Sequence, residues 1–263
     1  PLGNASVPAD QARVRYIQNN RLPREVQQRQ LEQLARFNRE HESQAGPDPS
    51  LEARINTFEL AFRMQTEMPL VEDLSNETVA TQRQYGMDDP VTANFGRMCL
   101  LARRFAEKGV RFIQVTHSDG KVQWDQHSDL KNGHEAKARE VDKPIAGLLE
   151  DLKQRGLLED TLVWWGGEFG RTPTAEGTNG RDHNPEGFTM WLAGGGVKPG
   201  LTYGQTDELG FHIVENPVHV RDLQATILHL LGLDHERLSV RFQGLDLRLT
   251  GVEPCQVVKG ILA

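Results

Sequence analysis

The sequence predicts an α/β protein in which helices cover a mostly parallel sheet. Two observations lead to this fold class. Short runs of β-branched and aromatic residues alternate with amphipathic helical segments in the second half of the chain. A strand predicted at Val110–Val115 is also followed by a long helix at Glu135–Gln154 and by a second strand at Thr161–Trp165. A crossover of this length joins parallel strands through a right-handed connection.

Helices precede the first predicted strand. The charged, glutamine-rich segment Arg24–Glu42 carries a loose apolar stripe and indicates a surface helix, which ends at the proline-rich turn after Gly46. Ser50 is expected to cap a second helix over Leu51–Met68, where apolar residues recur at helical spacing. A third helix is expected to begin at Asp89 and Pro90 and to end at Gly109, because cap, proline and glycine occur in the favoured order.

Two further elements complete the predicted order. Phe188–Ala193 has the composition of a third strand and ends in three consecutive glycines, and Val220–Leu231 is an amphipathic helix. We therefore expect a helical N-terminal extension over residues 1–49 and a larger domain over residues 50–263.

Composition excludes some classes of function. The chain has 263 residues, with 30 Lys and Arg against 37 Asp and Glu, which gives a net charge of −7. This acidic balance argues against a general nucleic-acid binder, which would carry a basic patch. No run approaches the roughly 18 consecutive apolar residues that a membrane-spanning helix needs. Two cysteines are too few for a disulfide framework.

Candidate functional residues follow or precede the predicted strands, in loops where α/β sheets carry their ligands. They are two histidines, two carboxylates and two arginines: Asp125, His127, Glu168, Arg171, Arg181 and His183. Imidazole and carboxylate groups are ligands for zinc, iron and manganese. The arginine guanidinium groups are suited to an anionic oxygen. The sequence therefore predicts a divalent metal site that takes a small anionic substrate.

Three motifs resemble a large bacterial family. They are Trp124-Asp-x-His-Ser-Asp-Leu130, Glu168-Phe-Gly-Arg-Thr-Pro173 and Gly180-Arg-Asp-His-Asn-Pro185. The family is sulfatase-like, of unknown function, and is placed in the alkaline phosphatase superfamily. The resemblance implies an alkaline-phosphatase-like α/β/α sandwich, of which residues 50–263 are the C-terminal part and whose N-terminal strand or strands are missing. It also implies metal-dependent hydrolysis of sulfate or phosphate esters, and export to the periplasm or beyond, although the chain shows no export signal.

The resemblance also assigns roles to the candidate residues. Asp125, His127 and His183 would bind one metal ion, for which zinc, calcium and manganese are the candidates. Glu168 would serve a second metal position and catalysis, and either Arg171 or Arg181 would stabilise charge on the transferred group. The sequence departs from the superfamily pattern in two ways: Phe169 replaces a histidine ligand, and no nucleophile in the expected context precedes Val110. We therefore expect activity to belong to a longer form.

Two alternatives stay open at this stage. His127, Asp129 and His183 match the two-histidine, one-carboxylate set of non-haem iron oxygenases. The departures from the superfamily pattern also fit a degenerate domain that binds an anion, a glycan or a partner without catalysis. The sequence does not choose between sulfate and phosphate, and it does not predict an oligomeric state.

Overall fold

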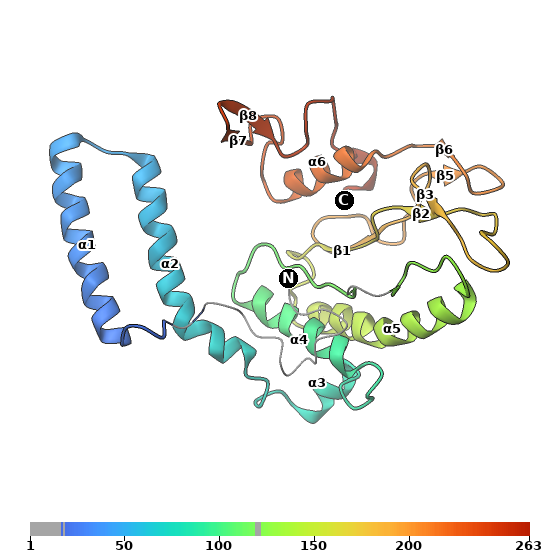
Figure 1. Ribbon diagram of the computed structural model, residues 1–263, viewed down its shortest axis with the longest axis horizontal. Helices are drawn as coiled ribbons and strands as arrows, with labels where there is room; N and C mark the ends of the chain where they lie inside the picture. The colour runs from blue at the N-terminus through green and yellow to red at the C-terminus, as the bar shows by residue number, and fades with distance from the viewer. Residues whose placement is uncertain (1–16, 18, 119–121) are drawn as a thin grey trace. The chain divides into compact units, whose positions relative to one another are not determined.

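The chain divides into two compact units, Pro1–His117 and Ser118–Ala263. The computed structural model describes residue 17 and residues 19–118 and 122–263 (Figure 1). The described part of the first unit contains the helices α1 (Arg24–Ala45), α2 (Pro49–Glu72), α3 (Val79–Gln84) and α4 (Ala93–Glu107). The boundary expected between residues 49 and 50 lies inside this unit, where α2 begins.

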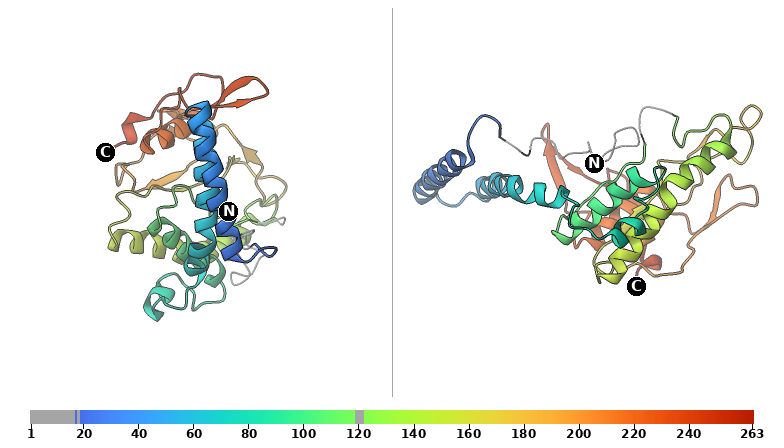
Figure 2. Two further views of the ribbon diagram at one scale, coloured as in Figure 1. Left: turned by 90° about the vertical axis from the view of Figure 1, so that its left-hand side faces the viewer. Right: turned by 90° about the horizontal axis from the view of Figure 1, so that it is seen from below.

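The first two helices run antiparallel (Figures 1 and 2). The Arg24 guanidinium of α1 lies 4.9 Å from the centre of the Phe62 ring of α2. The expectation that Ser50 caps the second helix is wrong, because the N-cap of α2 is Asp48, two residues earlier. The Asp48 carboxylate accepts hydrogen bonds from the backbone N–H groups of Ser50 and Leu51, so Ser50 already lies within the first turn of α2. This helix also continues to Glu72, and its apolar residues Met68 and Val71 are buried.

A buried ion-pair cluster fixes α4 in the first unit. The Arg103 side chain is only 2% exposed and lies 2.7 Å from carboxylate oxygens of both Glu77 and Glu107. Arg104 donates a second hydrogen bond to Glu77, also at 2.7 Å. Burial raises the pKa of Glu77, but the hydrogen bonds from Arg104 and Arg103 outweigh it and hold the pKa below its ordinary value.

The second unit contains two helices among its described residues, α5 (Leu130–Gln154) and α6 (Val220–Leu230). They lie on opposite sides of the strand formed by Val163–Trp165 (Figures 1 and 2). The strands are β1 (Val163–Trp165), β2 (Gly170–Arg171), β3 (His183–Asn184), β4 (Trp191–Ala193), β5 (Gln205–Thr206), β6 (Ile213–Glu215), β7 (Ser239–Phe242) and β8 (Leu245–Arg248); a short 3₁₀ helix, η1 (Lys259–Ile261), follows.

The predicted fold class is wrong. The strands of the described residues pair only as antiparallel two-stranded sheets, β1–β4, β2–β3, β5–β6 and β7–β8. There is no mostly parallel sheet among them and hence no alkaline-phosphatase-like α/β/α sandwich. The strand expected at Val110–Val115 does not form, and Phe112 in its centre is 71% exposed. Without that strand, α5 cannot act as a crossover, and β1 pairs with the later β4 instead.

The helix predictions agree better with the structure. α1 and α5 cover the segments predicted from periodicity, α6 covers its predicted segment except for Leu231, and α4 covers most of the third predicted helix. His219 and Asp222 form a capping box at the start of α6. In agreement with the absence of a long apolar run in the sequence, none of the helices of the described residues combines the length and the apolar character needed to cross a membrane.

Replacing Glu77 with alanine should destabilise the protein by about 3 kcal/mol, the low end of the range for breaking a buried ion pair, since Glu107 still faces Arg103. The free energy of unfolding from urea titration checks this value. Because the pKa of Glu77 is lowered, its stabilisation is present above about pH 4.3 and is lost as the pH falls through the lowered pKa.

Glu67→Ala is the matched control, because Glu67 and Lys108 form an exposed pair at 3.5 Å. It should cost less than about 1 kcal/mol. Equal losses in the two variants would contradict the importance of the buried cluster.

Candidate metal centre

The first part of the site is the loop that leads into α5. The Asp125 N–H donates to the Val122 carbonyl at 2.7 Å, and the His127 N–H donates to the Asp125 carbonyl at 3.1 Å. Asp129, which precedes α5, adopts a left-handed backbone conformation with φ of 50°. These tight local bonds fix Asp125 and His127 on one short stretch of backbone.

The second part of the site is the hairpin formed by β2 and β3. Arg171 and His183 are directly opposite each other in this antiparallel pair. Further along the hairpin, Thr172 donates its N–H to the Asp182 carbonyl at 2.9 Å. The backbone groups of Glu176 and Gly180 exchange two hydrogen bonds of 3.0 Å near its tip. The hairpin therefore presents Arg171 and His183 side by side, although they are 12 positions apart.

Backbone contacts join the loop to the hairpin. Arg181 donates its N–H to the Gln126 carbonyl and Leu130 donates its N–H to the Asn179 carbonyl, both at 3.1 Å. Gly180 lies against the loop so closely that a Cβ atom there would be 1.9 Å from the His127 carbonyl oxygen. Only glycine fits this position, because no side-chain atom can occupy that space.

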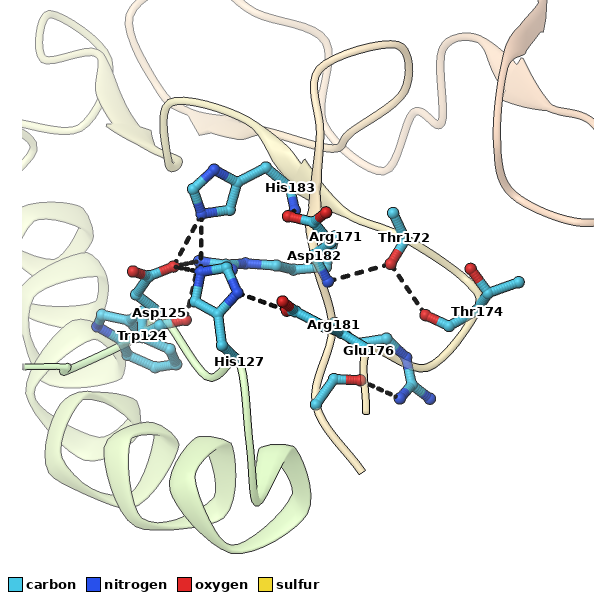
Figure 3. A network of polar contacts seen from close by, with 11 residues as sticks. Trp124, Asp125, His127, Arg171, Thr172, Thr174, Glu176, Arg181, Asp182 and His183 are labelled. Carbon is cyan, nitrogen blue, oxygen red and sulfur yellow. Dashed lines mark hydrogen bonds and ion pairs between the residues drawn. The ribbon is translucent and has the colours of Figure 1, made fainter. Parts of the chain in front are cut away.

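Three predicted ligands converge where the loop meets the hairpin (Figure 3). His127 Nε2 lies 3.1 Å from Asp125 Oδ1 and 3.2 Å from His183 Nε2. His183 Nε2 lies 3.0 Å from the same Asp125 oxygen. Two ligand atoms of a tetrahedral zinc site, each about 2.0–2.1 Å from the ion, are about 3.3 Å apart. The near-equilateral triangle therefore has the size of one face of such a site.

Arg171 and Phe169 support two of these ligands. The Arg171 guanidinium donates to Asp125 Oδ1 at 2.6 Å, and its cationic carbon lies 5.5 Å from the centre of the Phe169 ring. Phe169 in turn packs on the His183 imidazole, with ring centres 4.0 Å apart. Hydrogen bonds from Arg171 and His183 lower the pKa of Asp125 to about 2. The carboxylate is therefore ionised at neutral pH, as a metal ligand must be.

Other candidates from the sequence lie apart from this triangle. Glu168 is exposed and makes no hydrogen bond or ion pair within the described residues. The Arg181 guanidinium donates to the neighbouring Gly180 carbonyl and to no other group among them. The Asp129 carboxylate accepts a hydrogen bond from Asn132 instead of facing the two histidines. The structure thus brings together Asp125, His127, Arg171 and His183.

Sequence reasoning missed Glu176. Its carboxylate lies 2.5 Å from His127 Nδ1, and this hydrogen bond raises the pKa of His127 despite partial desolvation of the ring. His127, Glu176 and Asp182 form a second group of clustered ligand atoms. A separation of 2.5 Å is nevertheless too short for two ligands of one ion. It is below the roughly 2.7–2.9 Å of an ordinary charge-assisted N–H···O bond, so the ring and the carboxylate are in direct hydrogen-bonding contact. Glu176 belongs to none of the quoted motifs. Its distance from His127 along the sequence does not predict the contact, because the contact is made by the folding of the β2–β3 hairpin.

Comparison with known proteins places the chain in a family. A family model described as "Protein of unknown function (DUF1501)" matches residues 2–262. The chain belongs to the DUF1501 family. No curated protein and no solved structure matches the chain. The DUF1501 description names no activity and no superfamily, so the likeness of this DUF1501 chain to sulfatases rests on its sequence motifs alone.

Replacing Gly180 with alanine should push the hairpin away from the loop and destabilise the protein by about 1–3 kcal/mol, as overpacking does in a well-packed site. Thermal unfolding measures the loss, and the imidazole resonances of His127 and His183 should shift in NMR spectra.

Gly167→Ala is the matched control. A Cβ atom there would meet its nearest neighbour, the Phe169 carbonyl oxygen, at an ordinary 3.6 Å. Neither glycine has a positive φ, so the comparison isolates the effect of space. Unchanged imidazole resonances in Gly180→Ala would contradict the close approach.

Proposed function

We propose that this chain binds one divalent metal ion through Asp125, His127 and His183 and acts in the hydrolysis of phosphate or sulfate esters. The observation that carries the proposal is the triangle of ligand atoms, with edges of 3.0, 3.1 and 3.2 Å. Three protein ligands leave a coordination position open, which is the usual arrangement of catalytic zinc sites.

The ligand set favours zinc or manganese over calcium. Two of the three ligand atoms are imidazole nitrogens, whereas Ca²⁺ takes six to eight oxygen ligands. The three side chains are 41–52% exposed, so an ion and a substrate have access to them from solvent. An ion held there would supply Lewis acidity to an ester oxygen.

Arg171 is the residue suited to the anionic part of the substrate. One of its amino groups is bound to Asp125, and the other, Nη1, is buried and has no hydrogen-bond acceptor within the described residues. A buried donor without an acceptor is uncommon in native proteins. A small shift of the guanidinium would direct Nη1 to a phosphate or sulfate oxygen, for which its planar geometry is suited.

The proposal rests on the site and on the motif resemblance, and it takes no support from the overall fold. The family description is neutral on activity. The ester nature of the small anionic substrate, and export from the cytoplasm, are parts of the proposal that rest on the resemblance alone.

The metal part of the proposal predicts binding of one Zn²⁺ per chain, with Ca²⁺ binding much more weakly. Isothermal titration calorimetry and metal analysis after gel filtration measure both. The triple variant Asp125→Ala, His127→Ala, His183→Ala should lose more than about 100-fold in affinity, a larger loss than outer-shell changes cause.

His229→Ala is the control, because it removes an exposed imidazole on α6 that is not part of the triangle. It should bind zinc like the parent. Equal zinc binding by the triple variant and the parent would refute the metal site.

The hydrolase part predicts cleavage of p-nitrophenyl phosphate or p-nitrophenyl sulfate, measured by release of nitrophenolate from the zinc-loaded protein. This chain and a longer natural form that supplies the expected nucleophile are compared, and the longer form should be the more active one. Arg171→Ala should lower the rate about 100-fold, since removal of one donor to a developing charge costs this much. Arg181→Ala should have little effect, because among the described residues its guanidinium donates to the Gly180 carbonyl alone. Zinc binding without hydrolysis above the level of the triple variant, in this chain and in the longer form alike, would contradict the hydrolase assignment and leave a binding domain.

A further inference from the structure

We propose that Glu176 is a positioning residue that fixes the tautomer and the ring orientation of His127, so that Nε2 faces the metal. This inference rests on the proposed function, because it gives Glu176 an outer-shell role at the same metal site. It assigns a role to a loop residue that belongs to none of the sequence motifs.

The distances around the His127 ring carry the inference. Nδ1 lies 2.5 Å from Glu176 Oε2, whereas Nε2 lies 3.1 Å from Asp125 Oδ1 and 3.2 Å from His183 Nε2. The shorter contact places the proton of the neutral ring on Nδ1, where it is donated to the carboxylate. Nε2 then keeps its lone pair, and this is the atom that belongs to the ligand triangle.

Glu176 is held in place by the same backbone contacts that assemble the site. Its N–H and carbonyl both bond to Gly180, and Gly180 lies against the His127 carbonyl. The carboxylate and the ring are therefore fixed relative to each other at two points, by backbone packing and by the side-chain hydrogen bond. Metal-ligating histidines usually donate their second N–H to a carboxylate or carbonyl, which also raises the basicity of the ligand.

The alternative role for Glu176 is that of a ligand to a second ion, together with Asp182 and the same histidine. That role would require Nδ1 without a proton and a separation from Oε2 near 3 Å or more, because an ion would stand between the two atoms. The separation of 2.5 Å favours the hydrogen bond. One ion per chain is therefore expected.

The test compares the parent with Glu176→Gln and Glu176→Ala in two measurements. Long-range ¹H–¹⁵N correlation spectra of the metal-free proteins at pH 8.5 report the tautomer of His127, assigned with His127→Gln. The parent should show the Nδ1–H form, and Glu176→Ala should shift the ring toward the Nε2–H form. Calorimetry with Zn²⁺ should show a 10- to 100-fold loss of affinity in Glu176→Ala. Glu176→Gln should lose less, because its amide oxygen still accepts from Nδ1.

Glu186→Ala is the matched control. Glu186 follows β3 by two residues, and its carboxylate is exposed and makes no hydrogen bond to the described residues. It should change neither the tautomer nor the affinity. Unchanged zinc affinity and unchanged tautomer in Glu176→Ala would overturn the positioning role while leaving the metal site intact. Two ions per parent chain would also overturn it, in favour of the ligand role. Absence of zinc binding in the parent itself would overturn the proposed function and this inference together.

Discussion

The close approach of Gly180 to the His127 carbonyl is the constraint on which the site depends. No side-chain atom fits there, so the β2–β3 hairpin can lie flat against the loop before α5. The hydrogen bonds from Arg181 to Gln126 and from Leu130 to Asn179 then hold the two segments together. The ligand triangle follows from this contact, because Asp125 and His127 come from one segment and His183 from the other.

The side chains of the site contribute little to holding the two segments together. Ion pairs between side chains that are 41–52% exposed add little to stability, because solvent screens them. The backbone contacts and the absence of a Cβ atom at Gly180 therefore position Asp125, His127 and His183. The charges of these side chains determine which kind of ligand the proposed site would bind. A metal ion bound to Asp125, His127 and His183 would cross-link the two segments and add its binding free energy to their association.

Local patterns predicted the helices well and the sheet poorly, for a physical reason. The periodicity of α1, α5 and α6 is a property of contiguous residues, and each helix satisfies its own backbone hydrogen bonds. Strand pairing requires a distant partner, and the composition of Val110–Val115 does not reveal that this segment stays irregular and exposes Phe112. The error in that one segment changed the predicted fold class, because the parallel arrangement was inferred from the crossover between it and Thr161–Trp165.

Three of the candidate metal-ligating residues, Asp125, His127 and His183, lie together in the structure, but for a different reason from the one expected. The expectation placed the candidate residues at the carboxyl edge of a parallel sheet, which does not exist among the described residues. The two-residue antiparallel pair β2–β3 brings the candidate residues together instead. Arg171 and His183 are opposite each other in it, and the hairpin beyond them places Glu176 against His127. Residue type singled out Asp125, His127 and His183, since imidazole and carboxylate groups keep their chemistry in any fold. Glu176 was missed because its role comes from the path of the hairpin, which residue type does not encode. The proposed chemistry therefore depends on a short loop–hairpin contact, and similarity of the surrounding fold to the superfamily is not needed for it.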